Sequence, residues 1–191
     1  LSDLNLGGGY GVRYTAEDEA INIPARLAEL AAYLKEETER LGLPMPRFLM
    51  EPGRSIVADA GMTLYTVGSV KRIPGYKQYA AVDGGMTDNP RYALYQSRYT
   101  VYHAHKSGSM ERFDVVGRCC ESGDIIQPGV ELPGDTCRGD ILAVCTTGAY
   151  NYSMASNYNR LPRPAVVMLT PDRIYEAVRR ETFADLTGLD L

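Results

Sequence analysis

The spacing of apolar residues divides the chain into two parts of different character. Over residues 15–41, leucines and isoleucines recur mostly three or four positions apart, with Glu and Lys between them, and this predicts an amphipathic helix. Gly42 is expected at the C′ position of that helix, and Pro44 lies just beyond it. Shorter apolar runs at residues 1–6 and 47–50 predict strands before and after the helix.

A glycine-containing turn follows each of these two strands. The triplet GGG occupies residues 7–9, EPGR occupies residues 51–54, and residues 55–60 are expected to open another helix. The order strand, loop, helix, strand, loop, helix is typical of a parallel α/β sheet. A complete (β/α)8 barrel needs about 250 residues. Residues 1–61 are therefore predicted to supply only the last strand–helix units of such a barrel.

After residue 61 the pattern changes to short β-branched and aromatic runs between Gly- and Pro-rich turns, which is typical of an antiparallel β domain. We therefore predict a C-terminal β-barrel or sandwich domain over residues 62–191. It is expected to carry a terminal helix over residues 171–186, where Pro171 and Asp172 suit the first turn. The predicted strands are residues 63–73, 78–82, 98–103 and 141–145, and the predicted turns are IPGY, DGG, QPGVELPGD and CRGD.

Composition and charge exclude several function classes. A net charge of −4 and a pI near 5.3, with no basic cluster, argue against a nucleic-acid partner. Neither an apolar run long enough to span a membrane nor a secretory leader is expected from the pattern. Four cysteines without paired CxxC motifs predict reduced thiols in a cytoplasmic protein. His103 and His105 alternate on an expected strand, but without a third ligand no metal site is predicted.

The two glycine turns are the first candidates for chemistry. Glycines after a strand allow backbone amides to approach an anion closely, although one such turn is equally well explained as a plain connection. Two successive strand–glycine turns at the end of an α/β segment match the phosphate site of α/β barrels. Arg54 suits bidentate binding of a carboxylate or phosphate, with a solvated surface charge as the alternative. We therefore predict a phosphorylated cofactor or substrate.

Five segments in a fixed order carry a resemblance to a known family. They are GGGYG, EPGRSIVADAG, VDGGMTDNPRYALY, GRCCESGDII and TGAYNYSMASNYN. Together they resemble the fold type III, alanine-racemase-like decarboxylases that depend on pyridoxal phosphate. EPGR is shared by the ornithine and arginine branches, whereas CESGD with NPR-x-x-LY is typical of the branch that acts on diaminopimelate. The resemblance covers essentially the whole chain.

The resemblance implies a binding site for pyridoxal 5′-phosphate. Backbone amides of the two glycine turns would hold the phosphate, and a carboxylate would keep the ring nitrogen protonated. A tyrosine would lie against both cofactor and substrate. In that order, the implied residues are Gly7, Gly8, Gly9, Gly53 and Arg54 for the phosphate, Glu51 for the nitrogen, and Tyr150.

The resemblance also assigns the substrate contacts. Arg54, Arg91 and Tyr95 would bind the distal carboxylate of the substrate, and a helical turn would place the last two on one face. Glu121 would bind the distal ammonium group. Cys120 would be the acid that returns a proton to the carbanion, a role suited to a thiol that titrates near the working pH.

Other residues within these motifs have simpler interpretations. Cys137 and Cys145 are expected to be small buried apolar groups. Cys119 is given no role. Asp83 and Asp88 flank glycines and are expected to serve turns.

The function implied by the resemblance is decarboxylation of meso-2,6-diaminopimelate to L-lysine and CO2, in a homodimer with shared active sites. The family's Schiff-base lysine and its ring-stacking histidine match no motif here, so the chain is expected to be an inactive C-terminal portion on its own. Two alternatives stay open. One is a related decarboxylase for ornithine, arginine or carboxynorspermidine, and the other is a non-catalytic homologue.

Overall fold

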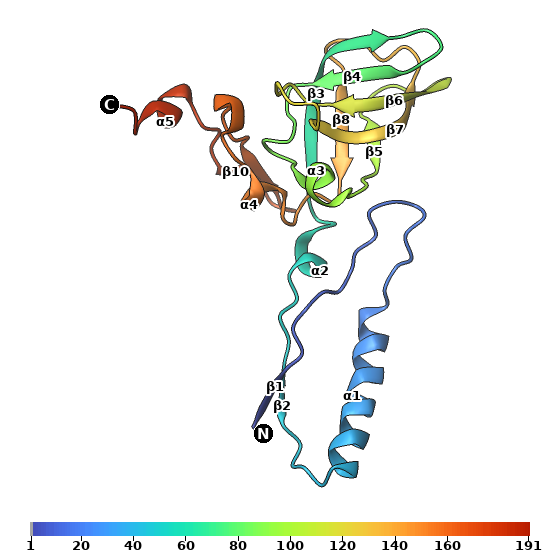
Figure 1. The fold of residues 1–191 in the computed structure, drawn as a ribbon, viewed down its shortest axis with the longest axis vertical. Coiled ribbons are helices and arrows are strands. Elements are labelled where there is room, and N and C mark those ends of the chain that lie inside the picture. Colours follow the sequence, from blue (N-terminus) through green and yellow to red (C-terminus); the bar gives the residue numbers. More distant parts are fainter. Residues whose placement is uncertain (1) are drawn as a thin grey trace.

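The structure is a computed structural model that describes residues 2–191. A curled sheet forms its largest unit, an arm carrying the longest helix projects from it, and the C-terminal segment lies to one side (Figure 1). In chain order the elements are β1 (Asp3–Asn5), α1 (Ile23–Arg40), β2 (Arg47–Leu49), α2 (Arg54–Val57), β3 (Met62–Arg72), β4 (Gln78–Val82), α3 (Arg91–Tyr95), β5 (Val101–His103), β6 (Met110–Val116), β7 (Ile125–Pro133), β8 (Ile141–Cys145), α4 (Asn151–Met154), a 3-10 turn (Tyr158–Arg160), β9 (Val166–Leu169), β10 (Ile174–Val178) and α5 (Phe183–Thr187).

The arm contains the expected strand–helix–strand unit. Strands β1 and β2 pair in parallel, with Leu4 opposite Phe48, and α1 lies in the connection between them. A crossover of this kind is what parallel neighbours require. An ion pair of 2.6 Å between Arg47 Nε and Asp3 Oδ1 joins the two strands at their start.

Helix α1 is shorter than the predicted 15–41. It begins at Ile23 because Asn22 caps it, its side chain accepting a backbone N–H of the first turn, and because Pro24 stands at the start of the helix. Its C-terminal end agrees with the prediction, since Gly42 has the left-handed φ of +65°.

The surface of α1 is amphipathic. Its stripe of Leu27, Leu30 and Leu34 is half-buried, and most other positions are exposed. Among residues 2–191, no helix is both long and apolar enough to cross a membrane.

The curled sheet has six strands in the order β5-β8-β3-β4-β6-β7. Strand β3 is shared: its first half pairs with β8 and its second half with β4. The prediction of an antiparallel domain is wrong at one ladder, because β4 and β6 run parallel. The chain returns from β4 to β6 through α3 and β5, and this long connection makes the parallel pairing possible.

The sheet curls around one apolar core, so that its two edge strands approach each other. The backbone N–H of Tyr99, ahead of β5, donates to Gln127 Oε1 of β7 at 2.8 Å and links the two edges. The domain is thus a nearly closed barrel. Its buried core consists of Tyr65, Val67, Ala80, Val82, Tyr99, Val101, Phe113, Val115, Ile126, Val130, Leu132, Leu142 and Val144.

Strands β6 and β7 were not predicted, and the turn expected in QPGVELPGD is largely strand. Residues 127–133 belong to β7, with Val130 and Leu132 buried in the core. Gly129 has φ +66° beside a register shift in the β6–β7 ladder, so Pro128 and Gly129 form a bulge within the strand.

The helix predicted over residues 171–186 is also wrong. An antiparallel hairpin of β9 and β10 occupies the first half of this range, with residues 171–172 in its turn. The helix α5 starts only at Phe183, where Thr182 and Asp185 form a capping box. The β-branched and aromatic content of β10 favours the strand.

Candidate active site

The two glycine turns lie side by side at the ends of β1 and β2. The N–H of Leu6 donates to the carbonyl of Leu49 at 2.9 Å, and the N–H of Glu51 donates to the carbonyl of Gly7 at 2.8 Å. A Cβ at Gly8 would overlap the carbonyl oxygen of Glu51, so the turns can approach this closely only with glycine there. The sequence indicated both turns, and the parallel pairing of their strands brings them together.

These turns leave backbone donors free. The N–H groups of Gly8, Gly9, Gly53 and Arg54 have no acceptor among residues 2–191. Nearby amides without partners form a concave donor set that suits a phosphate group. The turns therefore fit the phosphate of a cofactor such as pyridoxal phosphate.

The side chain of Glu51 is fixed from β1. Asn5 donates from Nδ2 to Glu51 Oε1 at 2.5 Å, and Asn5 Oδ1 accepts the N–H of Gly7 at 2.8 Å. Asn5 thus links the carboxylate to the first glycine turn. It was not singled out from the sequence, because it stands before the motif and its partner is 46 residues away.

Tyr150 reaches the second glycine turn from the sheet domain. The loop after β8 docks on α2, where Gly148 N–H donates to Ala58 O and Thr147 N–H donates to Gly61 O, both at 3.0 Å. The hydroxyl of Tyr150 then lies against Gly53, where a Cβ would overlap it. Gly53 and Tyr150, 97 positions apart in the sequence, thereby come into contact.

Arg54 and Arg91 carry buried nitrogen atoms without partners. The Nε atoms of both have no acceptor among residues 2–191, and Arg91 as a whole is only 5% exposed. The guanidinium carbon of Arg54 lies 6.0 Å from the ring centre of Tyr14, and that of Arg91 lies 5.3 Å from the ring centre of Tyr95. A buried guanidinium without an anion is costly, so Arg91 suits an incoming carboxylate, and the partly exposed Arg54 has an unpaired Nε that could bind the same group.

Buried polar side chains surround Arg91. Tyr14 packs edge-on against Tyr99 with ring centres 5.4 Å apart. Burial raises the pKa of the Tyr99 hydroxyl, against the opposing effects of the nearby Asn151 and Arg91. Asn151 is 3% exposed, and both of its amide atoms lack partners among residues 2–191. Asn151 was missed in the sequence, where its polar neighbours hid its burial.

The Cys119–Asp124 turn is built around one carboxylate. Asp124, 4% exposed, accepts the N–H of Cys119 and the N–H of Met86, both at 2.6 Å. It also fills the space beside Gly85 and Gly117, where a Cβ would collide with its oxygens. Asp124 thus joins the GRCCESGD and DGGMTDNPR segments.

The two candidate side chains of this turn, Cys120 and Glu121, and the neighbouring Cys119 differ in exposure and ionisation. Burial raises the pKa of the Cys119 thiol to about 11, while Cys120 is exposed. The N–H of Gly123 and the hydroxyl of Ser122 lower the pKa of Glu121, so this carboxylate is charged at neutral pH. An exposed thiol thus precedes, in the sequence, a carboxylate that is ionised at neutral pH.

The remaining predictions in this region have mixed outcomes. Asp88 accepts the N–H of Gly85 at 2.9 Å, as expected of a turn residue, and it also accepts the hydroxyl of Tyr65. Asp83 does not serve its own turn but accepts the N–H of Thr66 on β3 at 2.8 Å. Cys137 is exposed rather than buried, because it lies in the turn after β7. Cys145 is partly exposed on β8.

The candidate residues form two groups that do not touch. Arg54, Tyr150 and the glycine turns lie at the junction of the arm and the sheet domain, whereas Cys120 and Glu121 lie in their own turn. Within residues 2–191 no hydrogen bond, ion pair or ring contact joins the two groups. In the same residues, no cluster of three His, Cys, Asp or Glu side chains is suited to a metal ion.

The chain is similar in sequence to known pyridoxal-dependent decarboxylases. A sequence profile described as "Pyridoxal-dependent decarboxylase, C-terminal sheet domain" matches residues 14–148. Diaminopimelate decarboxylase of Bacillus subtilis is 50% identical over 98% of this chain and 43% of its own length. The Staphylococcus aureus enzyme of that name is 42% identical over 96% of this chain and 44% of its own. The chain therefore spans less than half the length of these relatives.

Solved structures give the same result. A crystal structure of diaminopimelate decarboxylase from M. jannaschii superposes with a TM-score of 0.93, at 32% identity, over 100% of this chain and 43% of that one. A lysine/ornithine decarboxylase from Vibrio vulnificus, complexed with cadaverine, superposes less well. Its TM-score is 0.71 at 26% identity, over 84% of this chain and 41% of that one.

Proposed function

The chain belongs to the pyridoxal-dependent decarboxylases, and from this membership we propose that it forms the C-terminal part of a diaminopimelate decarboxylase. The reaction removes one carboxylate of meso-2,6-diaminopimelate as CO2 and leaves L-lysine, the last step of lysine biosynthesis. The observation that carries the proposal is the buried Arg91, whose Nε has no acceptor among residues 2–191. Diaminopimelate brings a distal carboxylate to such a site, whereas ornithine and lysine have none.

Pyridoxal phosphate, when bound, supplies an acceptor for the electrons that decarboxylation leaves behind. The chain's part is to hold and orient it. We assign its phosphate to the free amides of residues 8–9 and 53–54, since the N–H of Gly7 already donates to Asn5, and its ring nitrogen to Glu51. Tyr150 covers it from the sheet domain, a role supported by the contact of its hydroxyl with Gly53.

The distal end of the substrate is a zwitterionic amino acid, so its recognition needs both signs of charge. Arg54 and Arg91 bind its carboxylate, with Tyr95 beside Arg91. Glu121, which stays ionised, binds its ammonium group. This pairing selects diaminopimelate over diamines and monocarboxylic substrates.

Cys120 is the proton donor in this scheme. After the carboxylate leaves as CO2, the Sγ–H bond breaks and its proton forms the new C–H bond, and the resulting thiolate regains a proton from solvent. Its exposure permits this exchange.

The separation of the two residue groups supports a shared active site. We propose a two-fold homodimer in which the Cys120–Glu121 turn of one subunit completes the site at Arg54 and Tyr150 of the other. We also propose a domain boundary after residue 61, between α2 and β3. The four free thiols are consistent with a cytoplasmic setting.

The likeness to the V. vulnificus enzyme keeps lysine or ornithine as a second candidate substrate. The test is Arg91→Gln in the full-length enzyme, with the exposed Arg138→Gln as the matched control. Loss of a buried ionic contact should lower kcat/KM for diaminopimelate by 100-fold or more, on the order of 3 kcal/mol. The control should stay near wild type. Unchanged turnover in Arg91→Gln, or equal turnover of ornithine by the wild type, would overturn the proposal.

A third candidate is a protein that binds a partner without catalysis. Full-length protein that binds pyridoxal phosphate but releases no CO2 from any diamino acid would favour it.

A further inference from the structure

The backbone of Cys120 is held from outside its own turn. Its N–H donates to Asn159 Oδ1 at 2.7 Å, across 39 positions of sequence. Its neighbours are held internally instead: the N–H of Cys119 donates to Asp124, and the N–H of Glu121 donates to Cys119 O. The orientation of Cys120 therefore depends on a side chain that comes from the loop after α4.

That loop has an unusual backbone, which its own sequence and its neighbours explain. Asn159 has φ +56° and Arg160 has φ +57°, in the left-handed region that favours Asn and disfavours Arg. Arg160 is held there by its side chain, which donates from Nη2 to Asp190 Oδ2 at 2.6 Å and from Nη1 to Leu186 O at 3.0 Å. The C-terminal residues 186 and 190 thus hold Arg160, the residue that follows Asn159, in its conformation.

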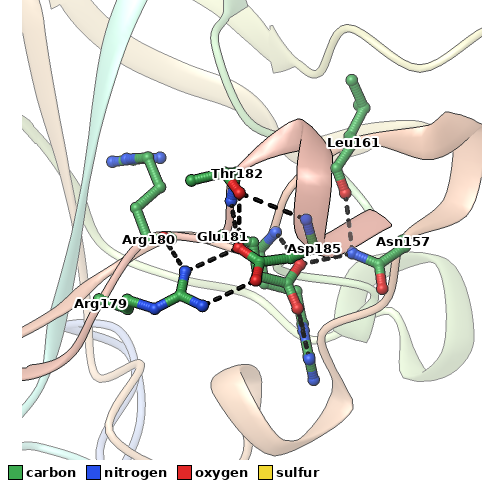
Figure 2. A network of polar contacts seen from close by, with 8 residues as sticks. Asn157, Leu161, Arg179, Arg180, Glu181, Thr182 and Asp185 are labelled. Carbon is green, nitrogen blue, oxygen red and sulfur yellow. Dashed lines mark hydrogen bonds and ion pairs between the residues drawn. The ribbon is translucent and has the colours of Figure 1, made fainter. Parts of the chain in front are cut away.

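Glu181 holds the residues that flank Asn159 in the sequence, Asn157 and Arg163. Asn157 donates from Nδ2 to Glu181 Oε2 at 2.7 Å and to Leu161 O at 3.1 Å, which closes the loop on itself (Figure 2). Arg163 donates its backbone N–H to Glu181 Oε2 at 2.8 Å and its Nε to Oε1 at 2.7 Å.

The residues around Glu181 are themselves anchored. Figure 2 shows Arg179 turned toward Asp185, with two contacts of 2.7 Å, and Thr182 bonded to the same carboxylate. The polar network thus ties residues 157–163 to residues 179–190. The loop that carries Asn159 is consequently held by polar contacts to the C-terminal segment.

A second contact from the same loop reaches the same turn. The hydroxyl of Tyr158 lies 3.5 Å from Glu121 Oε2. Consecutive residues of the loop therefore face consecutive residues of the turn, Asn159 on Cys120 and Tyr158 on Glu121.

We propose that Asn159 is a positioning residue for the proton-transfer step, holding the Cys120 backbone so that its thiol points to the reacting carbon. The inference rests on the proposed role of Cys120. Asn159 acts through its side-chain oxygen, while its left-handed backbone is a separate requirement that glycine and aspartate also meet.

Two variants of the full-length holoenzyme separate these features. Asn159→Gly keeps the backbone conformation and removes the acceptor, whereas Asn159→Asp keeps both. In Asn159→Gly we expect kcat for diaminopimelate to fall about 3- to 10-fold, the range that one hydrogen bond supports, with KM within about 2-fold. Hydrogen exchange of the Cys120 amide, followed by mass spectrometry, should rise by a similar factor. Asn159→Asp should stay within about 2-fold of wild type in both measurements.

Cys120→Ala, assayed beside these variants, separates this inference from the proposed function. If hydrogen exchange of the Cys120 amide is unchanged in Asn159→Gly, the inference is wrong. It is also wrong if that exchange rises but kcat stays at the wild-type value, while Cys120→Ala has reduced activity. If Cys120→Ala itself keeps full activity, the proposed role of Cys120 fails, and with it the positioning role of Asn159.

Discussion

Replacement of Gly148 by alanine tests how the sheet domain is docked on the arm. Gly148 has no positive φ, so alanine is acceptable to its backbone. Its Cβ, however, would overlap the carbonyl oxygen of Val57, lie 2.9 Å from the carbonyl carbon of Val57, and lie 3.1 Å from the carbonyl oxygen of Ala58. Non-bonded heavy atoms pack at about 3.5 Å, so the loop must retreat from the Val57 oxygen by roughly 1.5 Å.

The size of the effect follows from the contacts that this retreat breaks. The bonds from Gly148 N–H to Ala58 O and from Thr147 N–H to Gly61 O, both 3.0 Å, lengthen beyond hydrogen-bond range. Two net hydrogen bonds at about 1 kcal/mol each, and about 1 kcal/mol of residual overpacking, give a destabilisation of about 3 kcal/mol. The hydroxyl of Tyr150 also leaves Gly53, so kcat/KM for diaminopimelate should fall.

Gly68→Ala is the matched control, because a Cβ at Gly68 meets Ala81 O at an ordinary 3.6 Å. Urea unfolding of the full-length enzyme, followed by far-UV circular dichroism, measures both variants. Gly68→Ala should lie within about 1 kcal/mol of wild type. If Gly148→Ala unfolds at the same urea concentration as Gly68→Ala, the docking argument is wrong.

Three further predictions concern the core, the thiols and acid stability. Leu142→Ala, at a side chain with no exposed surface, should destabilise the sheet domain by about 2–5 kcal/mol in urea unfolding. Iodoacetamide at pH 8 should alkylate the exposed Cys120 faster than Cys119, because burial raises the pKa of the Cys119 thiol to about 11. Fragment-ion mass spectrometry distinguishes the two alkylation sites. Equal alkylation rates would contradict the burial argument. The contact with Arg163 lowers the pKa of Glu181 to about 2. The ionised Glu181 therefore contributes fully to folding stability above pH 4.5, and this contribution is lost as the pH falls toward 2. Thermal midpoints between pH 6 and 3 should therefore fall more steeply for wild type than for Glu181→Gln.

Local patterns predicted the elements whose burial is regular. The bounds of β4 and β8 were predicted correctly because apolar residues fill these short runs between clear turns. Strand β6 was missed because its first three residues, MER, are exposed and two of them are charged, and β7 was missed because Pro and Gly within it indicated a turn. The parallel β4–β6 ladder has no local signal, since it depends on where a long connection returns.

The candidate site shows the same division. Glycine turns and charged motifs are visible in the sequence because each is a short string with its own chemistry. Their partners are not, because Asp124 reaches Met86 and Asn159 reaches Cys120 only after the sheet has closed. The burial of Asn151 depends likewise on packing that no local pattern records.

The pairing of β3 has a consequence for synthesis on the ribosome. The second half of β3 can pair with β4 once a few more residues have been synthesised. Its first half pairs with β8, and because Thr66 pairs with Ile141, about 75 more residues must be synthesised before that partner strand exists. At 5–20 residues per second this is a delay of roughly 4–15 s, during which one strand edge is unpaired. Contacts this distant also slow folding after release. Translation speed through residues 67–145 should therefore influence how much of the nascent chain avoids aggregation.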